Sequence, residues 1–206
     1  MINMSAQNQR YYCRTKDLLW YRETKIAVEK VLHGDMTTAD IRRESLDKNI
    51  FNASSASRSK EIAQAVTRRI NAVDSAYLSF FVGRNTESQQ LLCIVMVMLT
   101  DHTFLEFMDS VYREKLIQQD NILRDSDIMG LFHRIQEKDE SAAKWTDASL
   151  RKVRDNYKSM LKEAGMLSES GTERKIIRPI LDKEMEDFLQ SEGLTRIYKI
   201  LAGERE

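Results

Sequence analysis

Apolar residues recur every three to four positions along most of the chain, which is the spacing of one face of an α-helix. The first such stretch covers residues 16–32 and ends at "HGDM", where Gly34 can take the left-handed conformation that closes a helix. A short helix to about residue 48 follows, with Thr37 or Thr38 as its N-cap. Another helix covers residues 57–73, after the polar loop "IFNASSAS". Two helices joined by a tight polar connection predict a helix-turn-helix.

The centre of the chain, residues 76–119, is dense in apolar residues. Three helices fit there, separated by "GRNTE" and "TDHT", and we expect them to form the hydrophobic core. The most apolar run, "LLCIVMVML" at residues 91–99, is far shorter than the roughly 20 residues that a membrane-spanning helix needs. It therefore predicts a buried core helix, and no membrane partner is expected. A helix at about 126–137 follows, with Ser126 or Asp127 as its cap.

The stretch "ASLRKVRDNYKSMLKEAGML" at residues 148–167 predicts a helix with two stripes. Thr146 or Asp147 caps it and Gly165 ends it. The apolar residues within an arc of about 100° are Leu150, Val153, Tyr157, Met160, Leu161 and Ala164. The neighbouring arc holds Arg151, Arg154, Lys158 and Lys162, interrupted only by Asp155. The apolar stripe would pack on the core, and the basic stripe would meet a polyanion.

A basic, β-prone stretch follows this helix. The sequence "SESGTERKIIRP" at residues 168–179 predicts a small hairpin. A helix, a short segment, a long helix and a basic hairpin in series are the order of a winged helix-turn-helix, in which the long helix faces the DNA major groove. The wing would then carry Arg174, Lys175 and Arg178 toward the adjacent phosphates.

Composition favours the same fold class, because a single proline and seven glycines in 206 residues leave few places to break helices. We therefore predict an all-α helical bundle with an N-terminal helix-turn-helix and a C-terminal winged helix-turn-helix carrying a small β-hairpin. The expected regions are 1–74, 75–122 and 123–206, packed as one compact unit.

The net charge is zero, but the charges are unevenly distributed. Residues 142–178 hold nine Lys/Arg and five Asp/Glu, a balance of +4, and residues 101–140 hold five and ten, a balance of −5. This segregation indicates a basic working surface, although ordinary variation in a charge-rich helical protein gives a similar pattern.

A second basic element lies in the helix at 57–73. It carries Arg58, Lys60, Arg68 and Arg69 against the single acid Glu61. Serine hydroxyls and arginines around a helix start can bind phosphate, whereas a solvated helix face is the alternative. The residues predicted to contact nucleic acid are Arg58, Lys60, Arg68, Arg69, Ser149, Arg151, Lys152, Arg154, Lys158, Lys162, Arg174 and Lys175.

Signatures of catalysis and of cofactor binding are missing from the sequence. Its three histidines have neither HExxH spacing nor a cysteine pair beside them, and no GxxxxGK[ST] or GxGxxG motif occurs. We therefore expect no enzyme activity, no metal and no cofactor. Two cysteines are too few for a disulfide framework and the first residues lack the apolar core of a signal peptide, so a cytoplasmic protein is expected.

An RNA-binding alternative comes from aromatic residues near the N-terminus. Tyr11, Tyr12, Trp20 and Tyr21 lie among basic residues, and aromatic rings can stack on unpaired bases. Aromatic residues near a terminus more often hold that segment against the core.

Four stretches in order carry a family resemblance. They are "ETKIAVEKVLHGDMTTADIRRESLDKNIF", "SASRSKEIAQAVTRRI", "VYREKLIQQDNIL" and "WTDASLRKVRDNYKSMLKEAGML". Together they resemble the BrxA family of the BREX (bacteriophage exclusion) phage-defence systems over roughly residues 18–190.

The resemblance implies an all-helical protein with a fold likened to the antitermination factor NusB, plus helix-turn-helix elements. It also implies binding to double-stranded DNA and action beside a methyltransferase and other defence components. Its DNA-facing elements match Arg58, Lys60, Arg68 and Arg69 in one helix, and Arg151, Lys152, Arg154 and Lys158 in the other.

The expected function is thus that of a non-enzymatic accessory protein that binds double-stranded DNA mainly through Lys/Arg–phosphate contacts. The alternatives are a NusB-like RNA-binding module and a scaffold that contacts other BREX components. The oligomeric state stays open, with a monomer as the preferred expectation.

Overall fold

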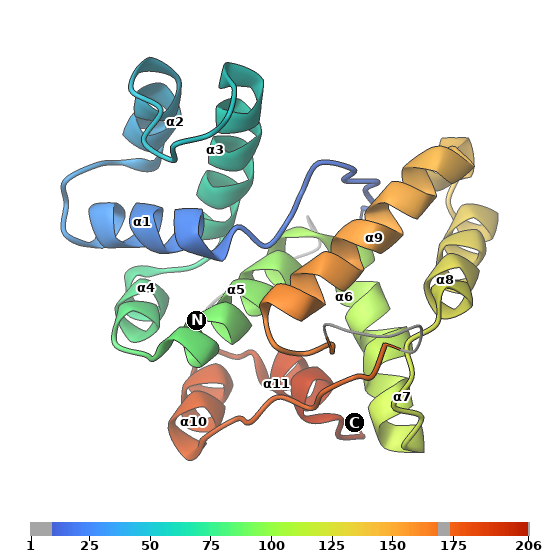
Figure 1. Ribbon diagram of the computed structural model, residues 1–206. Helices are drawn as coiled ribbons and strands as arrows, with labels where there is room; N and C mark the ends of the chain where they lie inside the picture. The colour runs from blue at the N-terminus through green and yellow to red at the C-terminus, as the bar shows by residue number, and fades with distance from the viewer. Residues whose placement is uncertain (1–9, 169–173, 206) are drawn as a thin grey trace.

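Helices make up nearly all regular structure in the computed structural model, which describes residues 10–168 and 174–205 (Figure 1). The α-helices are α1 (Tyr21–Leu32), α2 (Thr38–Asp47), α3 (Ala56–Ile70), α4 (Ser75–Val82), α5 (Thr86–Thr100), α6 (His102–Phe107), α7 (Glu114–Gln118), α8 (Asp125–Lys138), α9 (Asp147–Glu163), α10 (Lys183–Ser191) and α11 (Thr195–Ala202). A π-helix, η2 (Met108–Arg113), joins α6 to α7, and a 3₁₀ helix, η3 (Ala142–Lys144), precedes α9. The predicted all-helical fold class is confirmed.

Helices α1, α2 and α3 form one end of the molecule, where α2 and α3 lie side by side (Figure 1). Thr37 caps α2, as predicted, by accepting a hydrogen bond from the Asp40 amide at 3.1 Å. The Ser59 hydroxyl donates to the Ser45 carbonyl at 2.5 Å and so fastens α3 to α2.

The first helix begins at Tyr21, not at residue 16 as the sequence pattern predicted. Trp20 has φ 50°, a left-handed conformation that interrupts a helix. The carbonyls of Leu18 and Leu19 instead accept hydrogen bonds from the buried Arg69 side chain at 2.6 and 2.5 Å. A long-range contact therefore replaces the first helical turn.

Helix α5 is the core of the fold, since every residue from Leu91 to Thr100 is buried. It contacts α3 on one side and α9 on another, so helices from all three predicted regions meet around it. Among the described residues no single helix is long and apolar enough to cross a membrane. The pair formed by α5 and the run His102–Gln118 would be long enough together, but it is bent by 113°.

Short extended segments lie before α8 and after α9 in the C-terminal third. Isolated antiparallel bridges join Ile122 to Lys175 and Leu167 to Ile176. The predicted β-hairpin is thus reduced, within the described residues, to single bridges, and its predicted tip at 169–173 lies outside them. No prediction was made for α10 and α11, which close the molecule beneath α4 and α5 (Figure 1).

Candidate nucleic-acid interface

Helix α9 is built as the sequence predicts at both ends. Thr146 is the N-cap and accepts a hydrogen bond from the Ser149 amide at 3.2 Å, and the Ser149 hydroxyl lies 3.0 Å from the Thr146 hydroxyl. Ser149 therefore stabilises the start of the helix, in addition to its predicted contact with nucleic acid. At the other end Gly165 has φ 69°, and the Met166 amide donates back to the Leu161 carbonyl at 2.8 Å.

The apolar stripe of α9 packs on the core. Tyr157 is buried against the rings of Phe104, Phe107 and Phe132, with ring centroids 4.9, 5.2 and 5.8 Å away. Edge-to-face and tilted contacts of this kind add to the stability gained from burial alone. The rotation of α9 about its axis is therefore fixed, and with it the direction of the basic stripe.

The basic stripe divides into an exposed part and a neutralised part. Arg151 of the stripe and the adjacent Lys152, in the first turns, are exposed and have no acidic partner within 4 Å among the described residues. The side chains of Arg154 and Lys158 are only 19% and 5% exposed. Lys162 is partly buried. The surface offered to a polyanion is thus centred on the N-terminal half of the helix.

Asp125, at the start of α8, neutralises Arg154 and Lys158, which follow the exposed first turns of α9. Its carboxylate lies 3.0 Å from Arg154, 2.7 Å from Lys158 and 3.7 Å from Arg174. Asp155 adds contacts to Arg154 at 3.0 Å and Lys158 at 2.9 Å. The acidic and basic regions that the sequence shows as separate blocks therefore interlock in space.

Asp155 is held in its charged form by these neighbours. Partial burial alone would raise its pKa, but hydrogen bonds from Lys158 and Arg154 outweigh burial and lower the pKa below its ordinary value. The carboxylate therefore remains a fixed negative charge within the basic stripe at neutral pH.

The segment after α9 presents two further exposed cations, Lys175 and Arg178. Lys175 is exposed, and its amide donates to the Ser168 hydroxyl at 3.0 Å. Arg174 is partly exposed, and its carbonyl accepts from the Leu123 amide at 2.9 Å. The backbone pairing fixes both residues beside α8, with Arg174 directed to Asp125.

In the first half of α3, Arg58 and Lys60 have different surroundings. The Arg58 guanidinium lies over the Trp20 ring at 4.9 Å and 3.6 Å from Glu61. Glu61 also accepts from Lys16 at 2.5 Å, and this hydrogen bond lowers its pKa. Lys60 is exposed. Of this pair, Lys60 is the side chain that solvent reaches freely.

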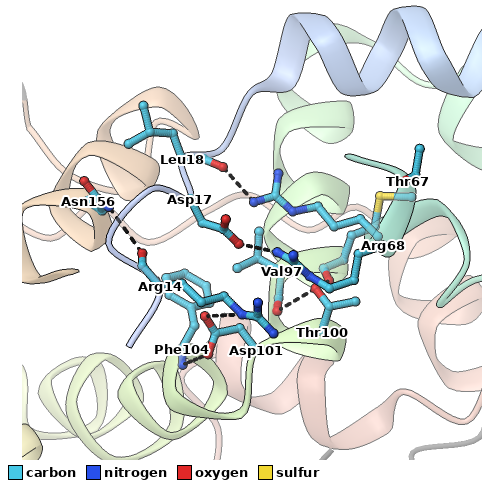
Figure 2. A network of polar contacts seen from close by, with 12 residues as sticks. Arg14, Asp17, Leu18, Thr67, Arg68, Val97, Thr100, Asp101, Phe104 and Asn156 are labelled. Carbon is cyan, nitrogen blue, oxygen red and sulfur yellow. Dashed lines mark hydrogen bonds and ion pairs between the residues drawn. The ribbon is translucent and has the colours of Figure 1, made fainter. Parts of the chain in front are cut away.

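Arg68 and Arg69, in the last turn of α3, are engaged inside the molecule, and Figure 2 shows Arg68 directed at Asp17. Arg69 is fully buried and donates to the Leu18 and Leu19 carbonyls, while Arg68 pairs with Asp17. Burial lowers the pKa of both guanidinium groups from its ordinary value. The prediction that Arg69 faces nucleic acid is wrong for this fold, and Arg68 serves the same internal network.

The network continues from α3 to the N-terminal segment, α6 and α9 (Figure 2). Arg14 lies 3.6 Å from Asp101, and the Asn156 side-chain amide of α9 donates to the Thr15 carbonyl at 2.9 Å. Asp101 also caps α6 by accepting from the amides of Thr103 and Phe104. Burial raises the pKa of Asp101 to about 6, with the nearby Arg14 opposing the shift.

The aromatic residues that suggested RNA stacking are largely occupied within the protein. Trp20 and Tyr21 are buried, and the Tyr21 hydroxyl donates to Gln89 at 2.7 Å. Tyr11 packs on His102 at a centroid distance of 4.8 Å, and Tyr12 lies near Arg10 and Arg14. The Tyr11 ring packs the N-terminal segment against α6, and the Tyr21 hydroxyl joins it to α5.

Within the described ranges, no cluster of three or more His, Cys, Asp or Glu side chains is placed to hold a metal ion. Cys93 lies in the core, where burial raises its pKa to about 12. A thiol so far from ionisation at neutral pH does not act as a nucleophile.

Sequence reasoning missed Asp101, Asp125 and Asn156. Asp125 carried a detectable signal, because it begins a helix next to the basic one and acids at such positions often pair with a neighbouring element. Asp101 and Asn156 bind partners that are 87 and 141 residues away along the chain, and no local pattern marks them.

Comparison with known proteins agrees with this architecture. Residues 12–193 match the model of the BrxA family. The BREX protein BrxA of Bacillus cereus (strain H3081.97) is 30% identical over 192 residues, covering 93% of this chain and 94% of that protein. The crystal structure of an uncharacterized protein from Magnetospirillum magneticum has a similar fold, with a TM-score of 0.77 and 17% identity over 95% of this chain and 98% of that one. The family match spans most of the sequence, and the chain therefore belongs to the BrxA family of BREX systems.

Proposed function

We propose that this protein is a non-enzymatic, cytoplasmic accessory component of a BREX phage-defence system that binds double-stranded DNA through the exposed half of α9. The observation that carries the proposal is the pair Arg151 and Lys152. Both side chains are exposed, lie on a helix whose opposite face is locked to the core, and lack an acidic partner in the described part of the chain. Such a pair is free to exchange condensed counterions for contacts to DNA phosphates.

The order of elements around α9 supports a winged-helix arrangement. A short extended segment with Ile122 precedes α8, and segments with Leu167 and Ile176 follow α9 and are joined by antiparallel bridges. In such modules the second helix enters the major groove with its N-terminal residues nearest the bases. The exposed basic residues of α9, Arg151 and Lys152, are in that half, and Lys175 in the bridged segment would contact a flanking phosphate.

In the second predicted DNA-facing element, α3, only the first turns offer an exposed basic side chain. Lys60 is exposed there, whereas Arg58 is partly covered by Trp20 and Glu61, and the arginines of the last turn are engaged inside the fold. With few free cations, we expect binding to depend mainly on phosphate contacts and to show weak sequence preference.

The test is fluorescence anisotropy with labelled duplex DNA, single-stranded DNA and RNA of equal length, each at several salt concentrations. We expect duplex DNA to bind most tightly, with log affinity falling linearly with log salt. Arg151→Glu combined with Lys152→Glu should weaken duplex binding by at least about tenfold and reduce the magnitude of the salt slope by about two, since each phosphate contact contributes about 0.9.

The matched control carries the same charge change elsewhere. Arg22→Glu with Lys183→Glu alters exposed residues on α1 and α10 and should change duplex affinity far less. Preference for RNA would favour the RNA-binding module. Absence of binding to all three ligands by folded protein at low salt would reject both nucleic-acid functions.

A further inference from the structure

A polar groove lies where α7 meets the C-terminal turn. These elements lie away from the first turns of α9 (Figure 1). The groove consists of two adjoining hollows with volumes of about 350 and 500 Å³. Ile117 and Arg205 line both hollows. Gln118 lines the smaller hollow, and Asn121 and Arg178 line the larger one. We call this surface the α7 groove.

The walls of the α7 groove are held in place by specific contacts. Gly203 has φ 65°, and a Cβ atom at this position would lie 2.7 Å from Cβ of Leu116, so the C-terminal turn packs tightly on α7. The Tyr112 hydroxyl of η2 donates to the Ile177 carbonyl at 3.2 Å and holds the opposite wall. The π-helix η2 leads directly into α7, and π-helical turns are rare and frequently occur at functional sites.

The charge of the groove favours an anionic occupant. Arg178 and Arg205 are exposed, and no ion pair joins either of them to an acid among the described residues. Glu114 is the one acid among the described residues that line the two hollows. Two unneutralised guanidinium groups at one groove can accept carboxylates or phosphates in the forked geometry that arginine prefers.

Exposed apolar side chains decide between these anions. Ile177 is 46% exposed and Ile180 is 91% exposed. They are not among the residues that line the two hollows, but they flank the groove residue Arg178 in the sequence. Together with Leu46 they are the large apolar side chains that remain exposed in the described part of the chain. A nucleic-acid backbone offers nothing to cover isoleucine, whereas a protein segment with aliphatic side chains does.

We propose that the α7 groove binds an acidic segment of a partner protein of the same defence system. Carboxylates of the segment pair with Arg178 and Arg205, and an aliphatic side chain covers Ile180. The proposal goes beyond DNA binding, because the α7 groove and the exposed half of α9 lie apart and can be occupied at once (Figure 1).

Photo-crosslinking tests the proposal in cells that express the full chain together with the other genes of its defence operon. The photoreactive residue p-benzoylphenylalanine replaces Ile180 in one strain and Leu46 in a control strain. We expect a crosslink from position 180 to one operon-encoded protein, at a peptide rich in Asp and Glu identified by mass spectrometry. Arg178→Glu with Arg205→Glu should reduce this crosslink at least tenfold.

Three outcomes would overturn the proposal: no crosslink from position 180, a crosslink to nucleic acid, or a crosslink to a second copy of the chain. Arg178 lies close to Gly203, so a second variant guards against local distortion. Ile180→Asp changes an almost fully exposed side chain and should also abolish the crosslink when the photoreactive group is placed at Gln118 instead. Anisotropy with duplex DNA should stay within twofold of wild type for Ile180→Asp, which alters no predicted DNA contact, and this result separates the proposal from the one for α9.

Discussion

The last turn of α3 and the first turns of α9 each carry two adjacent basic residues, in very different surroundings. Arg68 pairs with Asp17 (Figure 2), and the fully buried Arg69 donates hydrogen bonds to two backbone carbonyls. Arg151 and Lys152 point outward into solvent. The role of a basic pair on an amphipathic helix therefore depends on the helix face that it occupies. The inward pair stabilises the fold, and only the outward pair is available to a ligand.

The largest change in stability among variants of the two basic pairs is expected for Arg69→Ala. The change leaves the Leu18 and Leu19 carbonyls without their buried donor and removes a large, fully buried side chain, which should cost about 3 kcal/mol or more of unfolding free energy. Urea denaturation of Arg69→Ala and Arg151→Ala would measure this, with Arg151→Ala within about 0.5 kcal/mol of wild type.

Gln64→Ala provides the control for α3, since this side chain is exposed on the same helix. If Arg69→Ala kept wild-type stability and lost DNA affinity, the contrast between the two helices would fail and Arg69 would return to the DNA-contact set.

A pH effect of similar size should come from Asp101 in the same internal network. Its folded-state pKa of about 6 lies above the ordinary value of 3.8, so the folded chain binds more protons than the unfolded chain between these values. The contribution of this group to stability is therefore full below about pH 4 and is lost as pH rises through 6. The loss is on the order of 3 kcal/mol.

Urea denaturation of wild type and Asp101→Asn from pH 4 to 7 measures this contribution. The stability of the variant relative to wild type should rise with pH across that window. Asp187→Asn, at an exposed position on α10, should show no comparable trend. A pH-independent difference for Asp101→Asn would mean that Asp101 stays charged in the folded protein.

The smallest effect concerns the neutralised part of α9. Asp125→Asn removes the carboxylate that faces Arg154, Lys158 and Arg174, and leaves Asp155 to satisfy Lys158. Duplex DNA affinity should rise by roughly two- to fivefold with a steeper salt dependence, while stability falls by less than about 1 kcal/mol. Asp187→Asn is again the matched neutralisation. Unchanged DNA affinity for Asp125→Asn would argue that DNA does not bind this face.

The local features of both helices were predictable from the sequence. These features are the Thr37 and Thr146 caps, the Gly165 stop and the buried stripe of α9. Each depends on residues within one or two helical turns of each other, so a local sequence pattern predicts it. The inward direction of Arg69 was not predictable, because it depends on carbonyls 50 and 51 residues away. Similarly, the interlocking of Asp125 with Lys158 depends on how α8 packs on α9. The NusB likeness and the wing tip stay predictions.

The contacts of the N-terminal segment also constrain the order in which the chain can fold. Tyr12 binds Thr103 across 91 residues, and Asn156 and Glu163 bind Thr15 and Tyr21 across 141 and 142 residues. Contacts of such long sequence separation carry a loop-closure cost that slows folding. Ribosomes release a chain from its N-terminus, so the segment synthesised among the first must wait for α9 before it docks. In the nascent chain the basic face of α9 and the segment that contacts it therefore become native together, after α9 has been synthesised.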